Sequence, residues 1–532
     1  MINTMDVTNG APLFIDYFAG WGGVSQGYFD ATGRHVDIAI NHNEDAISVH
    51  RANHPSTHHI QSSVWDVDIP RLVAGRPVMG LWGSPDCTHH SRARGGVPRK
   101  KNIRGLSWVL LKFGLHARPK VFGMENVVEI SSWGPLVDGQ VCQARKGETF
   151  DGFVRAWTTG IDPQHGAWQE MVRALDIEFD VKAKLALYKG LGYELEYRAL
   201  PMDRYGIHTS RLRFFLIARC DGEPIRWPVE THADNALGMR PRRGVGECID
   251  WTIPCRSILG RNKPLVEKTL QRIVRGIDRF VIADANPYLV PQAHLHQITP
   301  FVSDYQAVAG RYDASSILVG SMVKHYGGNY NGAGTSLREP LSTVTCVDHN
   351  ALLTTHIIKF KGSNTGHRMD EPLQTLTAGG LHYGEVQGSL RKLPGVWPQG
   401  KFDHGERGVP ARELTDDERY SAWWTARLIE EHRTGKAQKA PSIIPEPRVS
   451  MLVVDGWALV EIGMRMLTPR ELARAHDFPD SYILERGACG KKLSIAAQVR
   501  GIGNSVPPKM AELLIRANFP ELCGERGVKD AA

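Results

Sequence analysis

Short apolar runs alternate with longer, mixed segments over roughly the first 220 residues of the chain. Each run has the length of a buried strand, and the segments between them have the spacing of amphipathic helices, most clearly at 169–191. Strands that alternate with helices are typical of a doubly wound α/β domain with a mainly parallel sheet. The predicted strands cover residues 13–17, 36–40, 78–82, 121–124, 193–200 and 213–218.

The pattern changes at about residue 223, where Gly, Pro, Arg and Trp become frequent and the apolar runs shorten. The sequence of 338–345 recurs in altered form at 370–377, and two copies are too few for a stacked solenoid. We therefore expect duplicated β-hairpins in a mixed, mostly β domain. Nearer the N-terminus, segment 131–163 fits no element and is expected to be a lid or loop.

The α/β pattern returns after residue 463. Thr468 as N-cap, Pro469 as the first helical residue and Glu471 as the third predict the start of a helix. A last helix is expected at 508–517. The expected domains are 1–222 completed by 463–532, and 223–462 between them.

Composition favours a globular protein, with 42% hydrophobic and 23% charged residues. No stretch approaches the roughly 20 apolar residues of a membrane span. The first twelve residues lack the basic and apolar regions of a signal peptide. The eight cysteines form no C-x-x-C pair, which argues against a zinc site or a disulfide framework and favours a reducing cytoplasm.

The net charge of +7 is unevenly distributed. Between residues 240 and 279, ten Arg or Lys stand against four Asp or Glu. Such a patch suits a phosphate backbone, and an ordinary solvated basic face explains it equally well.

Two reactive side chains follow neighbouring predicted strands. Cys87 comes after strand 78–82, and Glu125 comes directly after strand 121–124. The carboxyl ends of parallel strands open into one crevice, where a thiolate could attack and a carboxyl could deliver a proton. A cysteine by itself is more often a small buried apolar residue, but this pairing favours a nucleophile. His89 and His90 beside it lack the second ligand cluster that a metal site needs, so no metal is expected.

A glycine-rich turn, Phe18-Ala19-Gly20-Trp21-Gly22-Gly23, joins the first strand to a helix. Glycines there allow a sharp turn and a close approach of the backbone to a ligand at the helix N-terminus. The second strand ends at Asn41 and His42, where a nucleoside-binding fold needs partners for ribose hydroxyls.

Six motifs in order along the chain resemble those of DNA (cytosine-5)-methyltransferases, most closely the bacterial and phage enzymes. The resemblance covers 13–222 and 463–518 and no part of the middle. The motifs are Phe18-x-Gly20-x-Gly22-Gly23, Pro85-Asp86-Cys87, Glu125-Asn126-Val127, Arg211-x-Arg213, Arg465-x-Leu467-Thr468-Pro469-Arg470-Glu471 and Gly503-Asn504-Ser505-Val506.

The resemblance implies a Rossmann-like, S-adenosylmethionine-dependent methyltransferase domain with a separate, mixed, mostly β target-recognition domain. Cys87 would attack carbon 6 of a flipped-out cytosine, and Glu125 would protonate ring N3. Asn126 would orient the loop, and Arg211 and Arg213 would hold the base oxygen, a phosphate or the thiolate environment. The implied cofactor residues are Phe18, Ala19, Gly20, Trp21, Gly22, Gly23, Asn41, His42, Ser63, Pro85, Asn504, Ser505 and Val506.

Four positions depart from the family's usual pattern. Asp86 separates Pro85 from Cys87, and a carboxylate there would raise the thiol's pKa unless a nearby cation compensates. The other three are Asn41 in place of an acid for the ribose, Ser63 with Asp66 nearby in place of an adenine-binding aspartate, and Thr209 in place of a glutamine.

Two alternatives stay open: a methyltransferase of the same chemistry that acts on tRNA, as one branch of the family does, and a catalytically silent DNA-binding relative. The large middle region favours DNA, because reading a duplex needs additional surface. The expected partner is double-stranded DNA, with no membrane and no obligate protein partner, for a monomer in the bacterial or phage-infected cytoplasm at the nucleoid. Neither the target sequence nor an accompanying restriction enzyme can be read from the chain.

Overall fold

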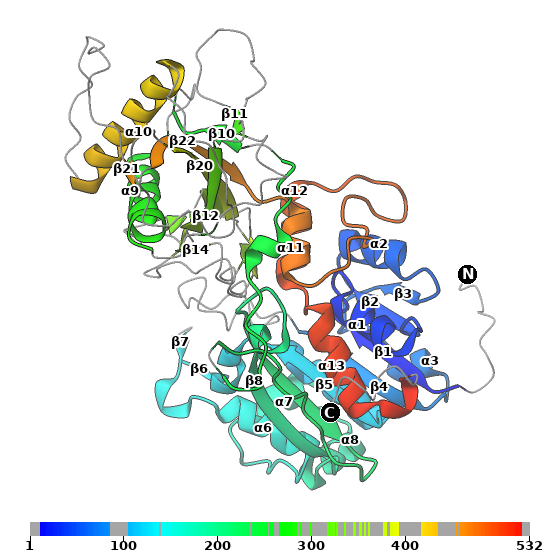
Figure 1. The fold of residues 1–532 in the computed structure, drawn as a ribbon. Helices are drawn as coiled ribbons and strands as arrows, with labels where there is room; N and C mark the ends of the chain where they lie inside the picture. The colour runs from blue at the N-terminus through cyan, green and yellow to red at the C-terminus, as the bar shows by residue number, and fades with distance from the viewer. Residues whose placement is uncertain are drawn as a thin grey trace.

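The computed structural model describes residues 11–85, 105–137, 140–234, 236–253, 255–259, 265–284, 288, 416–434 and 457–523, together with short strands between 298 and 454. These residues build two β-sheets at opposite ends of the molecule, with helices α11 (Pro469–Ala475) and α12 (Ile495–Asn504) between them (Figure 1). None of the helices in this described part is long and apolar enough to cross a membrane.

The first sheet has seven strands in the order β3-β2-β1-β4-β5-β9-β8. The first five strands of that order are parallel, and β9 runs antiparallel to both of its neighbours. The strands are β1 (Leu13–Tyr17), β2 (Ile38–Asn41), β3 (His58–Gln61), β4 (Val78–Gly83), β5 (Val121–Asn126), β8 (Glu194–Pro201) and β9 (Leu212–Arg219). The mixed α/β class expected from the apolar pattern is confirmed.

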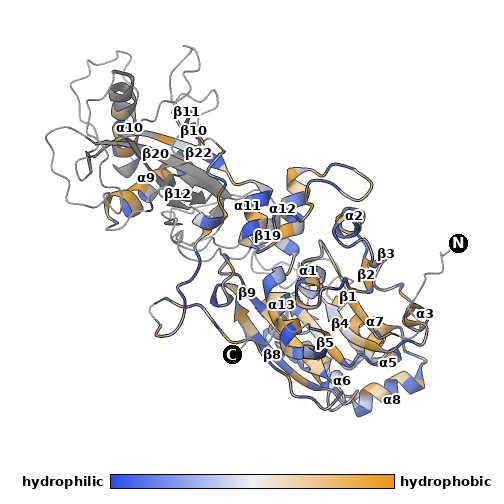
Figure 2. Cartoon of the chain, turned by 45° about the vertical axis from the view of Figure 1, so that its right-hand side comes forward, coloured by the Kyte–Doolittle hydropathy of each residue, from blue (hydrophilic) through white to orange (hydrophobic). Residues whose placement is uncertain are grey.

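Helices cover both faces of this sheet because alternate strand residues point to opposite sides. Ile15 and Tyr17 of β1 share a core with α5 (Leu111–His116), whereas Phe14 packs with α1 (Gly23–Thr32) on the other face. The strands carry mainly hydrophobic colour in Figure 2, as burial on two faces requires. The remaining helices of this part are α2 (Glu44–Asn53), α3 (Ile69–Val73), α6 (Glu148–Trp157), α7 (Trp168–Leu175), α8 (Val181–Lys189) and α13 (Pro508–Asn518).

Three predictions for this part were incomplete or wrong. Strand β3 was missed, because it has a single aliphatic residue and is only half-buried. The helix expected at 169–191 is two helices, since Asp176 takes a left-handed conformation (φ 55°) and Asp180 caps a new start. Segment 131–163 is not a lid or loop throughout: it contains α6, whose Trp157 stacks on Phe122 with ring centroids 4.5 Å apart.

The C-terminal helix α13 lies against α1, although the chain separates them by more than 470 residues. A Cβ on Gly27 of α1 would lie 2.6 Å from the Ala511 side chain, so glycine permits the close contact of the two helices. The start of α11 is confirmed in detail: Thr468 is the N-cap, Pro469 is in the first turn, and Thr468 and Glu471 form a capping box.

The second sheet is mostly antiparallel, in the order β11-β10-β22-β20-β12-β16-β17. The strands of this order are β10 (Cys255–Ser257), β11 (Ile298–Thr299), β12 (Ser316–Lys324), β16 (Asn350–Leu353), β17 (His356–Ile357), β20 (Tyr383–Lys392) and β22 (Trp457–Met466). In addition, β14 (Thr335–Ser336) pairs with β12, and β21 (Val453–Val454) pairs with β22. Helices α9 (Glu267–Ile277) and α10 (Asp416–Thr434) lie beside it (Figure 1).

Most of the two repeated segments, for which hairpins were expected, lies outside the described residues. Their ends are strands β15 (Val344–Cys346) and β19 (Leu376–Gly379), which pair in parallel, with Val344 opposite Leu376. These two residues hold equivalent positions in the two copies of the repeat, so equivalent strands of the two copies pair with each other. The pair lies beside α12 (Figure 2).

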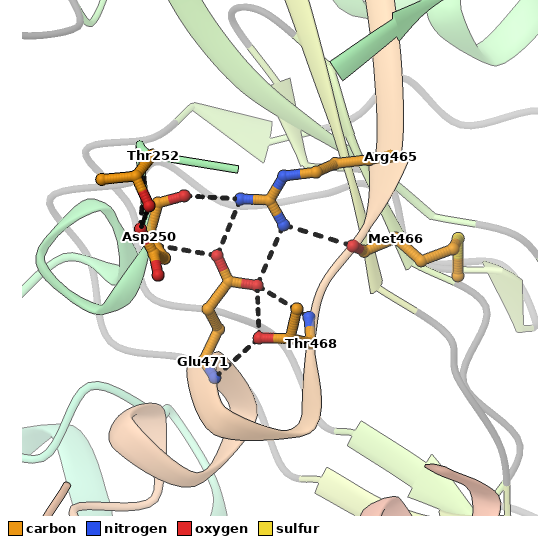
Figure 3. Close-up of polar contacts among 6 residues, drawn as sticks. All are labelled: Asp250, Thr252, Arg465, Met466, Thr468 and Glu471. Atoms are coloured by element: carbon orange, nitrogen blue, oxygen red, sulfur yellow. Dashed lines mark hydrogen bonds and ion pairs between the residues drawn. The ribbon is translucent and has the colours of Figure 1, made fainter. Parts of the chain in front are cut away.

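A buried carboxylate joins the two ends of the molecule at the point where β22 leads into α11 (Figure 3). Glu471 is fully buried and accepts hydrogen bonds from both terminal nitrogens of Arg465, at 3.0 and 2.8 Å. It also accepts from the backbone nitrogens of Thr468 (2.7 Å) and Asp250 (2.8 Å). The Glu471 side chain therefore links two parts of the chain: the segment at Asp250, which leaves the first sheet, and the end of β22, from which the chain returns toward that sheet.

Candidate active site

Most of the predicted site residues that the structure describes lie at the carboxyl edge of the first sheet. Strands β1 and β4 are neighbours, but β1 leads to α1 on one face and β4 leads toward α5 on the other. This reversal is the topological switch point at which open α/β sheets bind their ligands. The glycine-rich turn follows β1, Pro85 follows β4, and Glu125 and Asn126 are the last residues of β5.

The glycine-rich turn bends sharply, with positive φ at Phe18 (72°), Gly20 (53°) and Gly22 (83°). A Cβ on Gly20 would meet only the Phe18 carbonyl oxygen, at 3.8 Å. A Cβ on Gly22 would lie 2.5 Å from the Tyr482 hydroxyl, and one on Gly23 would lie 2.0 Å from the Val506 carbonyl oxygen. Among the described residues, Gly20 thus has open space beside it, while Gly22 and Gly23 admit the C-terminal segment.

The structure places the Trp21 side chain away from the site. Its ring is buried among residues of the C-terminal segment, including Leu472 and Val499. A Cβ on Gly501 of α12 would lie 2.0 Å from the indole, which shows how closely the helix covers it. Only the backbone of Trp21, with its neighbour Ala19, remains in the turn.

The predicted nucleoside contacts lie at the ends of the next strands. Asn41 is half-buried, and its side-chain oxygen accepts from the Asn43 backbone nitrogen at 2.9 Å. His42 is exposed. The Ser63 hydroxyl accepts from the Trp65 backbone nitrogen at 3.3 Å. The amide group of Asn41 therefore keeps its N–H donors for a ligand.

Glu125, Arg211 and Arg213 form a buried cluster, with exposed fractions of 6%, 3% and 8%. Oε1 of Glu125 lies 3.2 Å from Nε of Arg213 and 3.7 Å from Nη2 of Arg211. Arg211 also donates from Nη1 to the Gly503 carbonyl oxygen at 2.7 Å. These three predicted catalytic residues are thus brought together from β5 and from the start of β9.

Asn126 connects the ends of two strands. Its amide nitrogen donates to the Pro85 carbonyl oxygen at 3.1 Å, and its side-chain oxygen accepts from the Val127 backbone nitrogen at 2.9 Å. It therefore fixes the point at which the chain leaves β4 toward Cys87. Cys87 itself, with Asp86, His89 and His90, lies outside the described residues.

The cofactor contacts predicted in the C-terminal segment lie next to the glycine-rich turn. Ser505 is buried and caps the end of α12, and Val506 is buried against α1. Asn504 is exposed at the last turn of α12. The segment thus contributes backbone packing next to Gly23 and one polar side chain facing outward.

Sequence reasoning missed two groups of residues near the site. His476 is fully buried, and burial together with Arg211 and Arg213 holds its pKa well below the usual value. A set of four histidines, His35, His50, His54 and His59, contacts the underside of the glycine-rich turn. The spacing of these histidines along the sequence did not predict that they would lie near the site, because they come from separate elements.

Two arginines of the basic segment 240–279 form ion pairs with acidic side chains. Arg242 pairs with Asp203 at 3.1 Å and with Asp234, while Arg243 pairs with Glu247 at 2.7 Å. In the described part of the chain, no group of three or more His, Cys, Asp or Glu side chains could hold a metal ion.

Comparison with known families supports the motif-based expectation. The model of the C-5 cytosine-specific DNA methylase family matches residues 13–133 and 397–519. The resemblance on which the site prediction rested is thereby confirmed. No curated protein matches the chain.

Several solved structures are similar to the chain at low identity. A DNMT2 mutant from Spodoptera frugiperda is 13% identical, with 96% of this chain and 100% of that chain covered and a TM-score of 0.37. A putative DNA modification methyltransferase encoded within an E. coli prophage is 14% identical (96% and 99% covered, TM-score 0.36), and S. pombe Dnmt2 is 13% identical (96% and 99%, 0.39). Scores this low do not distinguish one substrate from another.

Proposed function

We propose that this chain, a member of the C-5 cytosine-specific DNA methylase family, methylates carbon 5 of a cytosine that is flipped out of a specific duplex DNA sequence. The methyl donor is S-adenosylmethionine and the nucleophile is Cys87. The observation that carries the proposal is the buried cluster of Glu125, Arg211 and Arg213 beside the strand end that leads to Cys87. A carboxyl and two guanidinium groups at a switch point suit a polar, flat base better than an apolar ligand.

The chemistry requires the base to be activated. Carbon 5 of cytosine is a weak nucleophile, and a thiolate that adds to carbon 6 moves electron density onto carbon 5. Glu125 would hold a proton at ring N3, and the arginines would stabilise the oxygen of the base or a phosphate. The reacting atoms lie inside a duplex, so the cytosine must leave the stack before Cys87 can reach it. After methyl transfer, loss of the carbon 5 proton and release of the thiolate restore the ring.

The residues around the glycine-rich turn fit the cofactor. S-adenosylmethionine supplies an electrophilic methyl group on a sulfonium centre. Gly20 would leave room for its methionine part, the N-terminus of α1, which has no side-chain cap among the described residues, would face its carboxylate, and Phe18 stands beside them. Asn41, His42 and Ser63 are the proposed partners of its nucleoside part, and Pro85, Ser505 and Val506 close the site with Asn504.

We assign catalysis to residues 1–222 with 463–532, and target recognition to 223–462 around the second sheet. This sheet lies at the end of the molecule away from β1 and β4 (Figure 1). The same catalytic residues would serve a tRNA methyltransferase, which is the second candidate. We favour DNA because the family model that matches is that of DNA methylases and because the recognition part is large.

Methyl transfer from labelled S-adenosylmethionine to duplex DNA and to tRNA tests the proposal. We expect methylated DNA, a covalent complex with DNA that contains 5-fluorocytosine, and neither product with Cys87→Ser. Bisulfite sequencing of DNA from cells that express the protein then identifies the target. Transfer to tRNA alone would replace DNA by RNA as the substrate, and covalent trapping of Cys87→Ser would overturn the role of the thiol.

A further inference from the structure

The bend at Trp21 and Gly22 is held from beneath by a residue of the C-terminal segment. Tyr482 is buried, and its hydroxyl donates to the Trp21 carbonyl oxygen at 2.5 Å. The absence of a Cβ on Gly22 makes room for this hydroxyl, since a Cβ would lie 2.5 Å from it. Burial raises the pKa of Tyr482, so the hydroxyl keeps its proton and remains a donor.

His54 supports the same bend from α2. Its Nε2 lies 3.4 Å from the Tyr482 hydroxyl. Its Nδ1 lies 3.0 Å from Nδ1 of His35. Because the Tyr482 hydroxyl gives its hydrogen to Trp21, Nε2 of His54 carries the hydrogen of their contact, so Nδ1 accepts and His35 donates. Burial lowers the pKa of His54 to about 3, which keeps this arrangement uncharged at neutral pH.

A second set of hydrogen bonds lies next to the one that His54 forms. His50 contacts the Ser25 hydroxyl at 2.9 Å and His59 at 2.8 Å, and Ser25 donates to the buried Asp16 at 2.7 Å. The rings of His50 and His54 are 4.7 Å apart. The turn thus rests on a buried polar layer contributed by β1, α1, α2, β3 and the C-terminal segment, and Tyr482 is its direct contact with the Trp21 carbonyl.

We propose that Tyr482 is a positioning residue for cofactor binding: it fixes the Trp21–Gly22 bend so that Gly20 presents its open side to S-adenosylmethionine. The proposal rests on the proposed function for the identity of the ligand. Tyr482 does not border Glu125, Arg211 or Arg213, so its loss should weaken cofactor binding and leave the chemical step intact. A residue with only a structural role would lower stability without this selective change.

Tyr482→Phe removes the hydroxyl and keeps the ring. The Trp21 carbonyl then loses a buried partner, and we expect the Kd for S-adenosylmethionine to rise about tenfold. Calorimetry measures the Kd, and methylation assays at saturating cofactor should return a kcat close to the parental value. The matched control is Tyr193→Phe, because the buried Tyr193 hydroxyl likewise donates to a backbone carbonyl, that of Pro119, at 2.6 Å. We expect the control to lower the melting temperature similarly and to leave the Kd unchanged.

A second pair of variants tests the same bend without Tyr482. His54→Gln keeps a donor near the place of Nε2 and should retain cofactor affinity, whereas His54→Leu should lose it about as strongly as Tyr482→Phe. This pair decides the question if Tyr482→Phe does not fold.

Three outcomes separate the explanations. Equal affinity in the parent and Tyr482→Phe would overturn the positioning role and leave the proposed function standing. Equal losses of affinity in Tyr482→Phe and Tyr193→Phe would reduce Tyr482 to a general stabilising residue and also overturn it. A parent protein that binds no S-adenosylmethionine would overturn the proposed function, and the positioning role with it.

Discussion

Two buried carboxylates of this protein, those of Glu471 and Glu125, differ in how fully arginines and other donors occupy their oxygens. Glu471 is saturated: both of its oxygens accept from Arg465, and backbone and hydroxyl donors fill the remaining positions, all within 3.0 Å (Figure 3). Glu125 is held more loosely, with Arg213 at 3.2 Å and Arg211 at 3.7 Å on the same oxygen. A saturated carboxylate can only hold the fold together, whereas a carboxylate with unused acceptor capacity can take part in chemistry.

Glu125→Gln tests this contrast with the largest expected effect. The amide keeps the shape but cannot supply the proton at N3, so kcat should fall by about 10²–10⁴-fold. The free energy of unfolding should change little, because the pairs with the arginines are long. Single-turnover methylation and thermal unfolding of the same samples provide the two measurements. Parental turnover would assign the proton to another residue.

Glu471→Gln should show the reverse behaviour. Its new NH₂ group would face donors from Arg465 and Thr468, and the free energy of unfolding should fall by about 3 kcal/mol. Molecules that remain folded at low temperature should keep a near-parental kcat. Chemical denaturation and methylation assays at the same temperature make the comparison. A large fall in kcat with unchanged stability would erase the distinction between the two carboxylates.

Asp16 extends the comparison to a carboxyl without a cation. Burial raises its pKa from 3.8 to about 7, against the hydrogen bond from Ser25. Between these values the folded state holds a proton that the unfolded state has lost, so this group's contribution to stability falls as pH rises from about 4 to about 7.

Asp16→Asn removes that dependence. We expect the variant to gain about 2 kcal/mol relative to the parent between pH 5 and pH 8, roughly half of the value for the full shift, because water penetration relieves part of the buried charge. Urea unfolding at the two pH values measures the difference. The histidines act in the other direction: burial lowers the pKa of His54 to about 3 and of His59 to about 4, so their contribution is lost below about pH 6.5 in both proteins. A difference between variant and parent that is constant with pH would contradict the assignment to Asp16.

The smallest effect is expected at the basic segment. Arg242 forms ion pairs with Asp203 and Asp234, and Arg243 forms an ion pair with Glu247. Their joint replacement by Ala should therefore leave the salt dependence of DNA affinity nearly unchanged, instead of flattening it as free phosphate contacts would require. Binding titrations at several salt concentrations measure the slope. A clearly flatter slope would place a phosphate contact here after all.

The sequence pattern predicted six of the seven strands of the first sheet because buried parallel strands leave continuous apolar runs. It missed β3, where two histidines replace the apolar residues, and α6, where Phe150, Phe153 and Trp157 follow the helical spacing within a segment interpreted as a loop. In both cases, burial was decided by neighbouring elements more than by the local pattern.

The sequence by itself determined the local features: the capping box at Thr468, the glycine-rich turn, and the place of Glu125 at a strand end. These depend on backbone geometry within a few residues. Only the tertiary structure decided that Tyr482 would support Trp21 across 461 residues, that Arg211 would contact Gly503, and that Gly22, unlike Gly20, would lie against the C-terminal segment. Such contacts arise from the way distant segments pack, and the spacing of residues along the sequence does not predict that packing.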